Sequence, residues 1–423
     1  MSVAVAFRFP SAIPTRRRHG AAPTMSISEP HRHVPDCRRG PHDDRRHPMT
    51  SPTPTSGSDA VARMMMTSTV AGAIDLAIGE PDQPLPQELA DAAARAFRDG
   101  RTGYTPKLGL PELRALIAAD TTSSSGRVPV EDVVVTVGGT GAVAVALIVG
   151  GTAGVVIPDP AWPNDLVLAE QLGLPVARYR QGPSGDDFFA LDEIEQALRA
   201  GFRLVVANSP SNPTGAVASA AAMAALVALV ERYGARILSD EAYESIVFDG
   251  GRAASPLDVG GRDVTFAART FSKRFSMTGL RLGSLVAPAE ARLAVAAVHG
   301  TTVGCAPITA QIVGATALER IPDRGTELSA IYRARYENAA AALPGRLASV
   351  TPSGLGGFYL WLDVRDTGRS GAALADELAA RGVLVSAGTV YSPEDGFLRA
   401  SLTAPDGALA TAWQTIDEVL GAS

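Results

Sequence analysis

Residues 203–240, RLVVANSPSNPTGAVASAAAMAALVALVERYGARILSD, contain two apolar runs on either side of a helical stretch. The runs RLVVAN (203–208) and ARILSD (235–240) show no alternation of polar and apolar residues, which is typical of strands buried on both faces. Such strands, when they alternate with helices, predict a mostly parallel sheet that is covered by helices. The pattern places the chain in the α/β class.

Similar runs extend this pattern along the chain. They are VVVTV (133–137), GVVI (154–157), VTFAA (264–268) and LGSLVA (282–287). Helices are predicted before these runs at 87–98 and from Pro111 onward. Past about residue 315 the pattern changes. A helix is predicted near 326–343, followed by the run GGFYLWLDV, a helix near 371–381, the runs VLVSAG and FLRASL, and a final helix. We therefore expect a large domain over 99–314 and a smaller α+β domain over 315–423, and we expect the N-terminal segment 59–98 to join the smaller domain.

The charge balance excludes several classes of function. The chain has 423 residues and a net charge of −6, but residues 1–48 hold nine arginines and four acidic residues, for +5. The remainder carries −11, so the folded body has no basic footprint for nucleic acid. No apolar run reaches the length that a bilayer span needs. We expect a soluble protein with neither a nucleic-acid nor a membrane partner.

Residues 1–58 are rich in Pro, Ser, Arg and His. Such a segment buries too little apolar surface to order itself, so we expect a disordered tail or an over-long start, since Met25 and Met49 can both initiate. Organellar targeting is a weaker reading of its early lack of acidic residues. Five histidines lie in this stretch without regular ligand spacing, and we predict no metal site.

The cysteines and lysines limit the chemistry further. Only Cys37 and Cys305 are present, so the sequence gives no support for a disulfide framework, and a cytoplasmic location is expected. Of the 38 basic residues, only Lys107 and Lys273 are lysines. Chemistry that needs a primary amine therefore has two places to occur.

Three strand ends carry candidate residues. VVVTV runs into a predicted glycine-rich turn with Gly139, Thr140 and Gly141, followed by a helix start, and this turn can bind phosphate or merely allow close packing. Neither the G-x-G-x-x-G spacing nor a P-loop lysine is present, so dinucleotide and nucleotide sites are not supported. After RLVVAN, Asn212 can bind a ligand oxygen or cap its own turn. After ARILS, the buried Asp240 needs a cationic partner, either a ligand or an arginine.

Lys273 follows the run VTFAA and lies between the hydroxyls of Thr270 and Ser272, with Arg281 eight residues later. A lone lysine is more often a solvated surface charge. In a chain that otherwise uses arginine, this lysine favours amine-specific chemistry, chiefly Schiff-base formation. Lys107 lies in a turn and lacks such a setting.

Together these motifs resemble the class I/II aminotransferases, the aspartate-aminotransferase-like branch of the fold type I pyridoxal 5′-phosphate enzymes. The resemblance covers roughly residues 74–423 and includes the lysine segment through Lys273, Gly279, Arg281 and Gly283. It implies that Lys273 forms the internal aldimine and then shuttles the substrate proton. It also implies that Asp240 keeps the pyridine nitrogen protonated, while Asn212 and Tyr243 bind the phenolic oxygen of the ring.

The same resemblance assigns the remaining site residues. Trp162 would stack on the ring, although it can also be a half-buried core residue. Three residues later the family often has a second aromatic, where this chain has Asp165, and the usual Ser or Gly before the lysine is Thr270. The phosphate ligands implied are Gly139, Thr140, Thr270, Ser272 and Arg281.

For the substrate, Arg399 would clamp the α-carboxylate and Gly79 would belong to a loop that closes over it. Tyr104 would reach the phosphate of a second subunit, which implies a homodimer with its active site at the interface. The activity implied is amino transfer between an L-amino acid and a 2-oxo acid by ping-pong kinetics. A rival on the same fold is β-elimination, cyclisation or oxidation. A non-catalytic DNA-binding sensor is disfavoured because residues 1–58 lack helix-turn-helix helices.

Overall fold

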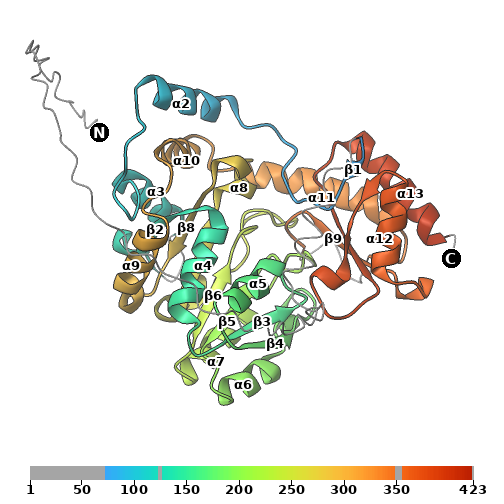
Figure 1. The fold of residues 1–423 in the computed structure, drawn as a ribbon, viewed down its shortest axis with the longest axis horizontal. Helices are drawn as coiled ribbons and strands as arrows, with labels where there is room; N and C mark the ends of the chain where they lie inside the picture. Colours follow the sequence, from blue (N-terminus) through green and yellow to red (C-terminus); the bar gives the residue numbers. More distant parts are fainter. Residues whose placement is uncertain (1–71, 122–125, 348–354, 422–423) are drawn as a thin grey trace, which may run out of the picture. The chain divides into compact units, whose positions relative to one another are not determined.

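Seven strands form one mostly parallel sheet in the order β2-β8-β7-β6-β5-β3-β4 (Figure 1). The computed structural model describes residues 72–121, 126–347 and 355–421. β8 is antiparallel to β2 and β7, and the other neighbours are parallel. The strands are β2 (Val133–Val137), β3 (Val155–Asp159), β4 (Val176–Arg180), β5 (Leu204–Asn208), β6 (Arg236–Asp240), β7 (Thr265–Thr270) and β8 (Leu282–Val286). The α/β class and six of these strands are confirmed; β4 was not predicted.

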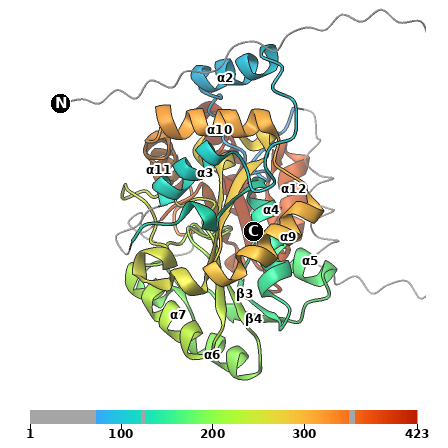
Figure 2. The same cartoon turned by 90° about the vertical axis from the view of Figure 1, so that its left-hand side faces the viewer.

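Both faces of this sheet are buried, as the uniformly apolar strands indicate. Leu204 and Val206 of β5 belong to one apolar cluster, and Val205 and Ala207 belong to another. Figure 2 shows α2, α3 and α10 at one end of the fold and α6 and α7 at the other. The face that carries Leu204 and Val206 is covered by α4 (Gly138–Gly150), α5 (Pro163–Gln171) and α9 (Arg292–Thr302). The opposite face, which carries Val205 and Ala207, is covered by α2 (Gln87–Arg98), α3 (Pro111–Thr121), α6 (Leu191–Arg199), α7 (Ala220–Arg232) and α10 (Ile308–Arg320).

The C-terminal part of the chain builds two smaller sheets. β9 (Tyr359–Asp363), β12 (Phe397–Ser401) and β11 (Ser386–Ala387) pair antiparallel, with β12 in the centre. β1 (Ile74–Asp75) pairs parallel with β10 (Val383–Leu384). Three helices share an apolar cluster with these strands: α11 (Arg324–Ala342), α12 (Gly371–Ala380) and α13 (Asp406–Gly421).

The N-terminal described segment makes contacts in both parts of the fold. β1 extends the small parallel sheet, whereas α2 packs against α10 beside the large sheet. The domain division at residues 98 and 314 stays a prediction. The tail at 1–58, with its histidines, lies outside the described residues.

Among the helices of the described ranges, none combines the length and the apolar character that a bilayer crossing requires.

Candidate active site

The parallel strands bring three polar residues to one edge of the large sheet. Asn208, Asp240 and Thr270 are the last residues of β5, β6 and β7, and Asn208 pairs in register with Asp240. Thr270 then caps the short helix α8 (Phe271–Arg274) by accepting a hydrogen bond from the amide of Ser272. This helix presents Lys273 at the same edge, where open α/β sheets bind ligands.

Lys273 contacts the segment that follows β1. Its Nζ atom donates a hydrogen bond of 2.7 Å to the carbonyl of Gly79. Burial lowers the pKa of this amine, and the positive charges of Arg281 and Arg399 lower it further, while Tyr359 and Glu80 act in the opposite direction. A lysine with a lowered pKa is more often a free base, which is the form that acts as a nucleophile or takes a proton.

Asp240 is a buried carboxyl group with a raised proton affinity. Burial raises its pKa to about 7, against the opposing influence of Lys273 and of a hydrogen bond from the amide of Ala242. The next residue, Glu241, forms an ion pair of 2.7 Å with Arg269. Asp240, in contrast, has no arginine partner among the described residues. It is therefore suited to bind a ligand cation.

Asn208 orders the turn that carries Asn212. Its Nδ2 atom donates to the carbonyl of Asp240 at 3.2 Å, and its Oδ1 atom accepts from the amide of Asn212 at 2.7 Å. The sequence analysis did not single out Asn208, although its position as the polar last residue of an apolar strand is a signal that was available. Asn212 is thereby held beside Asp240, and its side chain faces Arg399.

An anion cradle lies where α4 begins. The helix starts at Gly138, so the glycine-rich segment that was expected as a turn is its first helical turn. Gly138 has a φ of +69°, and a Cβ atom there would lie 2.6 Å from Nη2 of Arg281. A Cβ on Gly139 would approach Thr270 at 3.2 Å. The first-turn amides, a guanidinium and a hydroxyl thus converge on one small space, as phosphate binding requires.

The hydroxyls of the cradle are mutually hydrogen-bonded. Thr270 Oγ1 donates to Ser272 Oγ at 2.9 Å. Arg281 has a φ of +52°, a left-handed conformation that is uncommon for a residue with a side chain and that clusters at functional sites. Its Nη1 atom donates to the carbonyl of Thr278 at 2.9 Å, and the guanidinium stays exposed.

Arg399 is a buried arginine on β12 that faces the same edge. Nη1 donates to Oδ1 of Asn212 at 3.1 Å, Nη2 donates to the carbonyl of Ala77, and Nε has no partner in the described residues. The centres of the Tyr359 and Tyr391 rings lie 4.1 and 4.7 Å from the guanidinium carbon. These rings fix the plane of the guanidinium and leave it suited to bidentate carboxylate binding.

Tyr359 is a second residue that sequence reasoning missed. The Tyr243 hydroxyl donates to its hydroxyl at 3.4 Å, and burial raises the pKa of Tyr243. A Cβ atom on Gly79 would overlap the Tyr359 hydroxyl, so this close approach requires a glycine. Tyr359 sits in GGFYLWLDV, which reads as an ordinary strand and gives no chemical signal.

Tyr104 and Trp162 have different surroundings in the described part of the chain. Tyr104 is 99% exposed, and no contact of its side chain with another predicted site residue is recorded within the described ranges. Trp162 occupies the position just before α5 and packs against the apolar cluster on the α4 face. Asp165, which follows in the first turn of α5, is completely buried.

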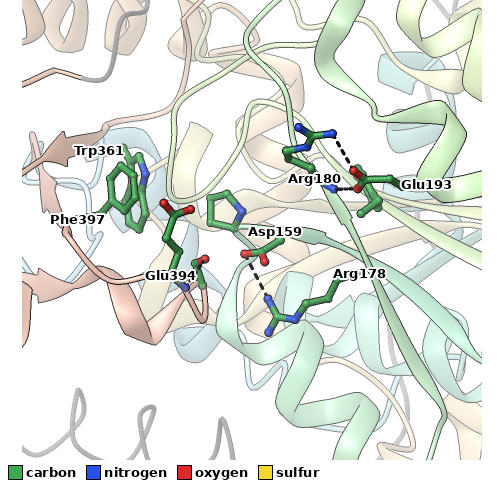
Figure 3. Close-up of a pocket in the computed structure, with 10 residues that line it drawn as sticks. Asp159, Arg178, Arg180, Glu193, Trp361, Glu394 and Phe397 are labelled. Carbon is green, nitrogen blue, oxygen red and sulfur yellow. Dashed lines mark hydrogen bonds and ion pairs between the residues drawn. The ribbon is translucent and has the colours of Figure 1, made fainter. Parts of the chain in front are cut away.

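A cavity of about 340 Å³ lies next to the site but contains none of the predicted site residues. Figure 3 shows the stacked rings of Trp361 and Phe397 on one side, and the ion pairs Asp159–Arg178 and Arg180–Glu193 on the other. Tyr391 separates it from Arg399, because its ring contacts Trp361 edge to face.

Comparisons with known proteins agree with this geometry. The profile of the family "Aminotransferase class I and II" matches residues 71–416. An aspartate aminotransferase of Pyrococcus horikoshii is 30% identical over 364 residues, which are 84% of this chain and 92% of that protein. A valine–pyruvate aminotransferase of Mycobacterium tuberculosis is 31% identical over 359 residues, 81% of this chain and 90% of that protein.

Solved structures give the same result. An aminotransferase from Mycobacterium tuberculosis superposes with a TM-score of 0.77 at 28% identity, covering 87% of this chain and 96% of that one. The aspartate aminotransferase from Thermus thermophilus with maleate gives 0.75 at 27% identity, covering 87% and 97%. The chain belongs to the class I and II aminotransferases. It is an aminotransferase that acts on amino acids and uses pyridoxal 5′-phosphate.

The residues at the sheet edge fit this cofactor. The cradle at Gly138 and Gly139 is a space that Cβ atoms would fill, and it combines the positive end of a helix with Arg281. Asp240, at the end of β6, supplies a buried carboxyl for which the described residues provide no arginine partner, and Lys273 follows the neighbouring strand β7. The donor set therefore suits a phosphate at one end and a pyridinium at the other.

Proposed function

We propose that the chain transfers the α-amino group of an L-amino acid to a 2-oxo acid, in two half-reactions with ping-pong kinetics, and that Lys273 is its central catalytic residue. The observation that best supports this is the setting of Lys273. Its amine donates a hydrogen bond to the Gly79 carbonyl, and burial lowers its pKa. The positive charges of Arg281 and Arg399 lower that pKa further. These are the two arginines that we assign to the phosphate and to the substrate carboxylate.

The cofactor ligands we propose are those at the sheet edge. Asp240 would bind the pyridine nitrogen, Asn212 and Tyr243 the phenolic oxygen, and Trp162 one face of the ring. Gly139, Thr140, Thr270, Ser272 and Arg281 would bind the phosphate. When bound, the cofactor supplies an electron sink for the negative charge that develops at the substrate α-carbon.

The chain's own residues perform the proton and binding steps. Arg399 would hold the substrate carboxylate through a bidentate contact, for which Tyr359 and Tyr391 fix the guanidinium plane. The free amine of Lys273 would take the proton from the substrate α-carbon at Nζ, which its lowered pKa favours. The neighbouring Gly79 carbonyl would orient that amine. Burial at the sheet edge would exclude competing water.

For the amino donor we propose an amino acid whose side chain carries no carboxylate. Arg281 and Arg399 are two arginines whose charge lowers the pKa of Lys273, and both already have anionic partners in this scheme. The adjacent cavity holds Arg178 and Arg180, but each is already paired with a carboxylate of the chain, Asp159 and Glu193 respectively, so neither is free for a second carboxylate of the substrate. The valine–pyruvate relative is consistent with this choice, whereas the aspartate relatives represent the competing choice.

We also propose a homodimer in which Tyr104 serves the partner's site. Tyr104 is 99% exposed, and Leu293 and Phe97 are two further large apolar side chains in water, at 86% and 63% exposure. The loop that carries Tyr104 is well ordered, because the buried Gln311 accepts from the amide of Leu110 and donates to Thr105. An exposed tyrosine on an ordered loop suits an interface.

Mixing two inactive variants tests the dimer. Lys273→Ala chains keep Tyr104, and Tyr104→Ala chains keep Lys273, so a mixed dimer would contain one complete site. Refolding the two together should restore activity to more than tenfold above either variant alone. Activity that stays at the level of the separate variants would contradict a shared site. The cytoplasmic location and the division into domains also remain proposals.

The amino-transfer proposal is tested by adding amino acids one at a time to the purified enzyme, without an oxo-acid acceptor. One equivalent of 2-oxo acid should form per site, together with a change in the visible absorption of the bound cofactor. Lys107→Ala is a matched control because it removes the only other lysine of the chain. It should behave like the parent, whereas Lys273→Ala should lose both signals. Ammonia or a ring-closed product would favour the elimination or cyclisation reactions instead.

A further inference from the structure

Asp165 is a buried carboxyl group that the proposed mechanism does not use. It lies in the first turn of α5, three residues after Trp162, and its exposed fraction is 0%. Neither of its side-chain oxygens has a hydrogen-bond partner among the described residues. A buried polar group without a partner is costly and calls for an explanation.

The titratable groups that act on Asp165 are Asp240 of β6 and Tyr179 of β4. The Tyr179 hydroxyl donates to the carbonyl of Val206 at 2.9 Å, so its proton is already engaged. No cation is recorded as acting on Asp165 within the described ranges. Glu241, by comparison, has Arg269 at 2.7 Å, and Asp159 has Arg178 at 3.4 Å. Asp165 therefore differs from the paired carboxylates around it.

Charge on Asp165 would be opposed from two directions. Burial removes it from water, and a second negative charge on Asp240 would repel it; both effects raise the pKa of Asp165 well above its usual range. The positive end of α5 favours a negative charge in its first turn, but this is a weaker effect than the loss of water from an unpaired buried carboxylate. The neutral acid is then the stable form, and it has an O–H group to donate.

We propose that Asp165 is a positioning residue: it remains a neutral carboxylic acid and donates a hydrogen bond to Asp240 once the cofactor holds Asp240 ionised. This fixes the carboxylate that binds the pyridine nitrogen. The inference rests on the proposed role of Asp240. It concerns a residue at which this chain departs from the aromatic that relatives often carry.

The first arm of the test measures stability in the full chain freed of cofactor, from pH 5 to pH 9. In the unfolded chain Asp165 ionises near pH 4, whereas the folded chain keeps its proton, so its presence destabilises the fold increasingly as the pH rises. Asp165→Asn does not titrate. Its folding constant, relative to the parent, should increase with pH, by about tenfold per pH unit for as long as the folded parent keeps the proton on Asp165.

Asp159→Asn is the matched control, because it removes a nearby carboxylate that has an arginine partner. It should give no such increase. A ratio for Asp165→Asn that does not change with pH would mean that Asp165 is ionised in the folded chain, and would overturn the proposal.

The second arm follows the bound cofactor in the holoenzyme. Asp165→Asn keeps a donor and should leave the pH midpoint of the visible absorption within about 0.3 units of the parent. Asp165→Leu has no donor and should raise the cofactor Kd roughly tenfold or more, since a hydrogen bond to a charged group is lost. It should also shift the midpoint. If Asp165→Leu binds the cofactor with the parent's Kd and pH midpoint, or if Asp165→Asn loses cofactor affinity as much as Asp165→Leu does, the contact with Asp240 is refuted.

The two arms separate this inference from the proposed function. The stability arm uses neither cofactor nor substrate, so its outcome does not depend on amino transfer. If Asp240→Asn binds the cofactor with unchanged absorption, the role of Asp240 fails, while the neutrality of Asp165 is still judged by the first arm.

Discussion

A methyl group at position 79 is expected to disturb the contact on which Lys273 depends. A Cβ atom built on Gly79 would overlap the hydroxyl of Tyr359 and lie 2.5 Å from its Cζ atom, whereas ordinary contact begins at 3.4 Å. The tyrosine ring has little room, because it is buried, its hydroxyl accepts from Tyr243, and the Arg399 guanidinium carbon lies 4.1 Å from its centre. The backbone at residue 79 must therefore move by about 1 Å to relieve the overlap.

The magnitude follows from the hydrogen bond that this movement breaks. The Lys273 Nζ atom lies 2.7 Å from the Gly79 carbonyl, and a displacement of about 1 Å takes it beyond hydrogen-bond range. A hydrogen bond from a charged or partly charged donor contributes about 1.5–3 kcal/mol. Misplacing a reacting group by about 1 Å costs on the order of 100-fold in rate. We expect Gly79→Ala to lower kcat/KM about 100-fold and the free energy of unfolding by about 1–3 kcal/mol.

The assay compares kcat/KM and urea unfolding for the parent, Gly79→Ala and a control. Gly407→Ala is the control, because Gly407 lies in the first turn of α13 and a Cβ there meets nothing within 4 Å. It should keep full activity. A Gly79→Ala enzyme with kcat/KM within twofold of the parent would refute the reasoning about Tyr359 and Lys273.

Three further predictions concern the same edge of the sheet. Asp240→Asn should remove a pH-dependent destabilisation of the cofactor-free chain, because the folded parent keeps the proton on Asp240 up to about pH 7 while the unfolded chain loses it near pH 4. In urea unfolding, the stability of the variant relative to the parent should rise by about 1.4 kcal/mol per pH unit between roughly pH 4 and 7 and stay level above. A stability difference that does not change with pH would contradict this prediction. Arg399→Lys should raise KM for the amino acid and lower kcat/KM roughly 100-fold, because lysine cannot make the bidentate contact; an unchanged KM would argue against its role. Gly138→Ala should weaken cofactor binding, since its Cβ would displace Arg281. If equilibrium dialysis finds the same affinity for the cofactor as in the parent, the phosphate does not bind in the anion cradle at Gly138.

The fold was predictable from the sequence wherever a strand is buried on both faces. The runs that end at Asn208 and Asp240 have no polar alternation, and α2 is the helix predicted at 87–98. β4 was missed because VARYR alternates at the sheet edge, with only its tyrosine buried. The prediction of a glycine-rich turn after β2 was wrong, because α4 already begins at Gly138, and a glycine tolerates the positive φ at that first position.

The candidate site was predictable where a chemical residue type follows a strand, as with Lys273 and Asp240. Tyr359 was not, because an aromatic in a strand looks like core, and only the fold places its hydroxyl against Gly79. Asp165 was noted as a departure from the family, but its burial beside Asp240 depends on the packing of α5, which local sequence does not encode. Long-range contacts of this kind set the finer properties of a site.

The most direct measurement of the central claim is a single half-reaction. The purified enzyme with bound pyridoxal phosphate is mixed with one amino acid in the absence of an acceptor, and the 2-oxo acid released is counted per site. One equivalent from the parent and from Lys107→Ala, with none from Lys273→Ala, is the predicted result. Release of 2-oxo acid by Lys273→Ala at the parental rate would contradict the assignment of Lys273.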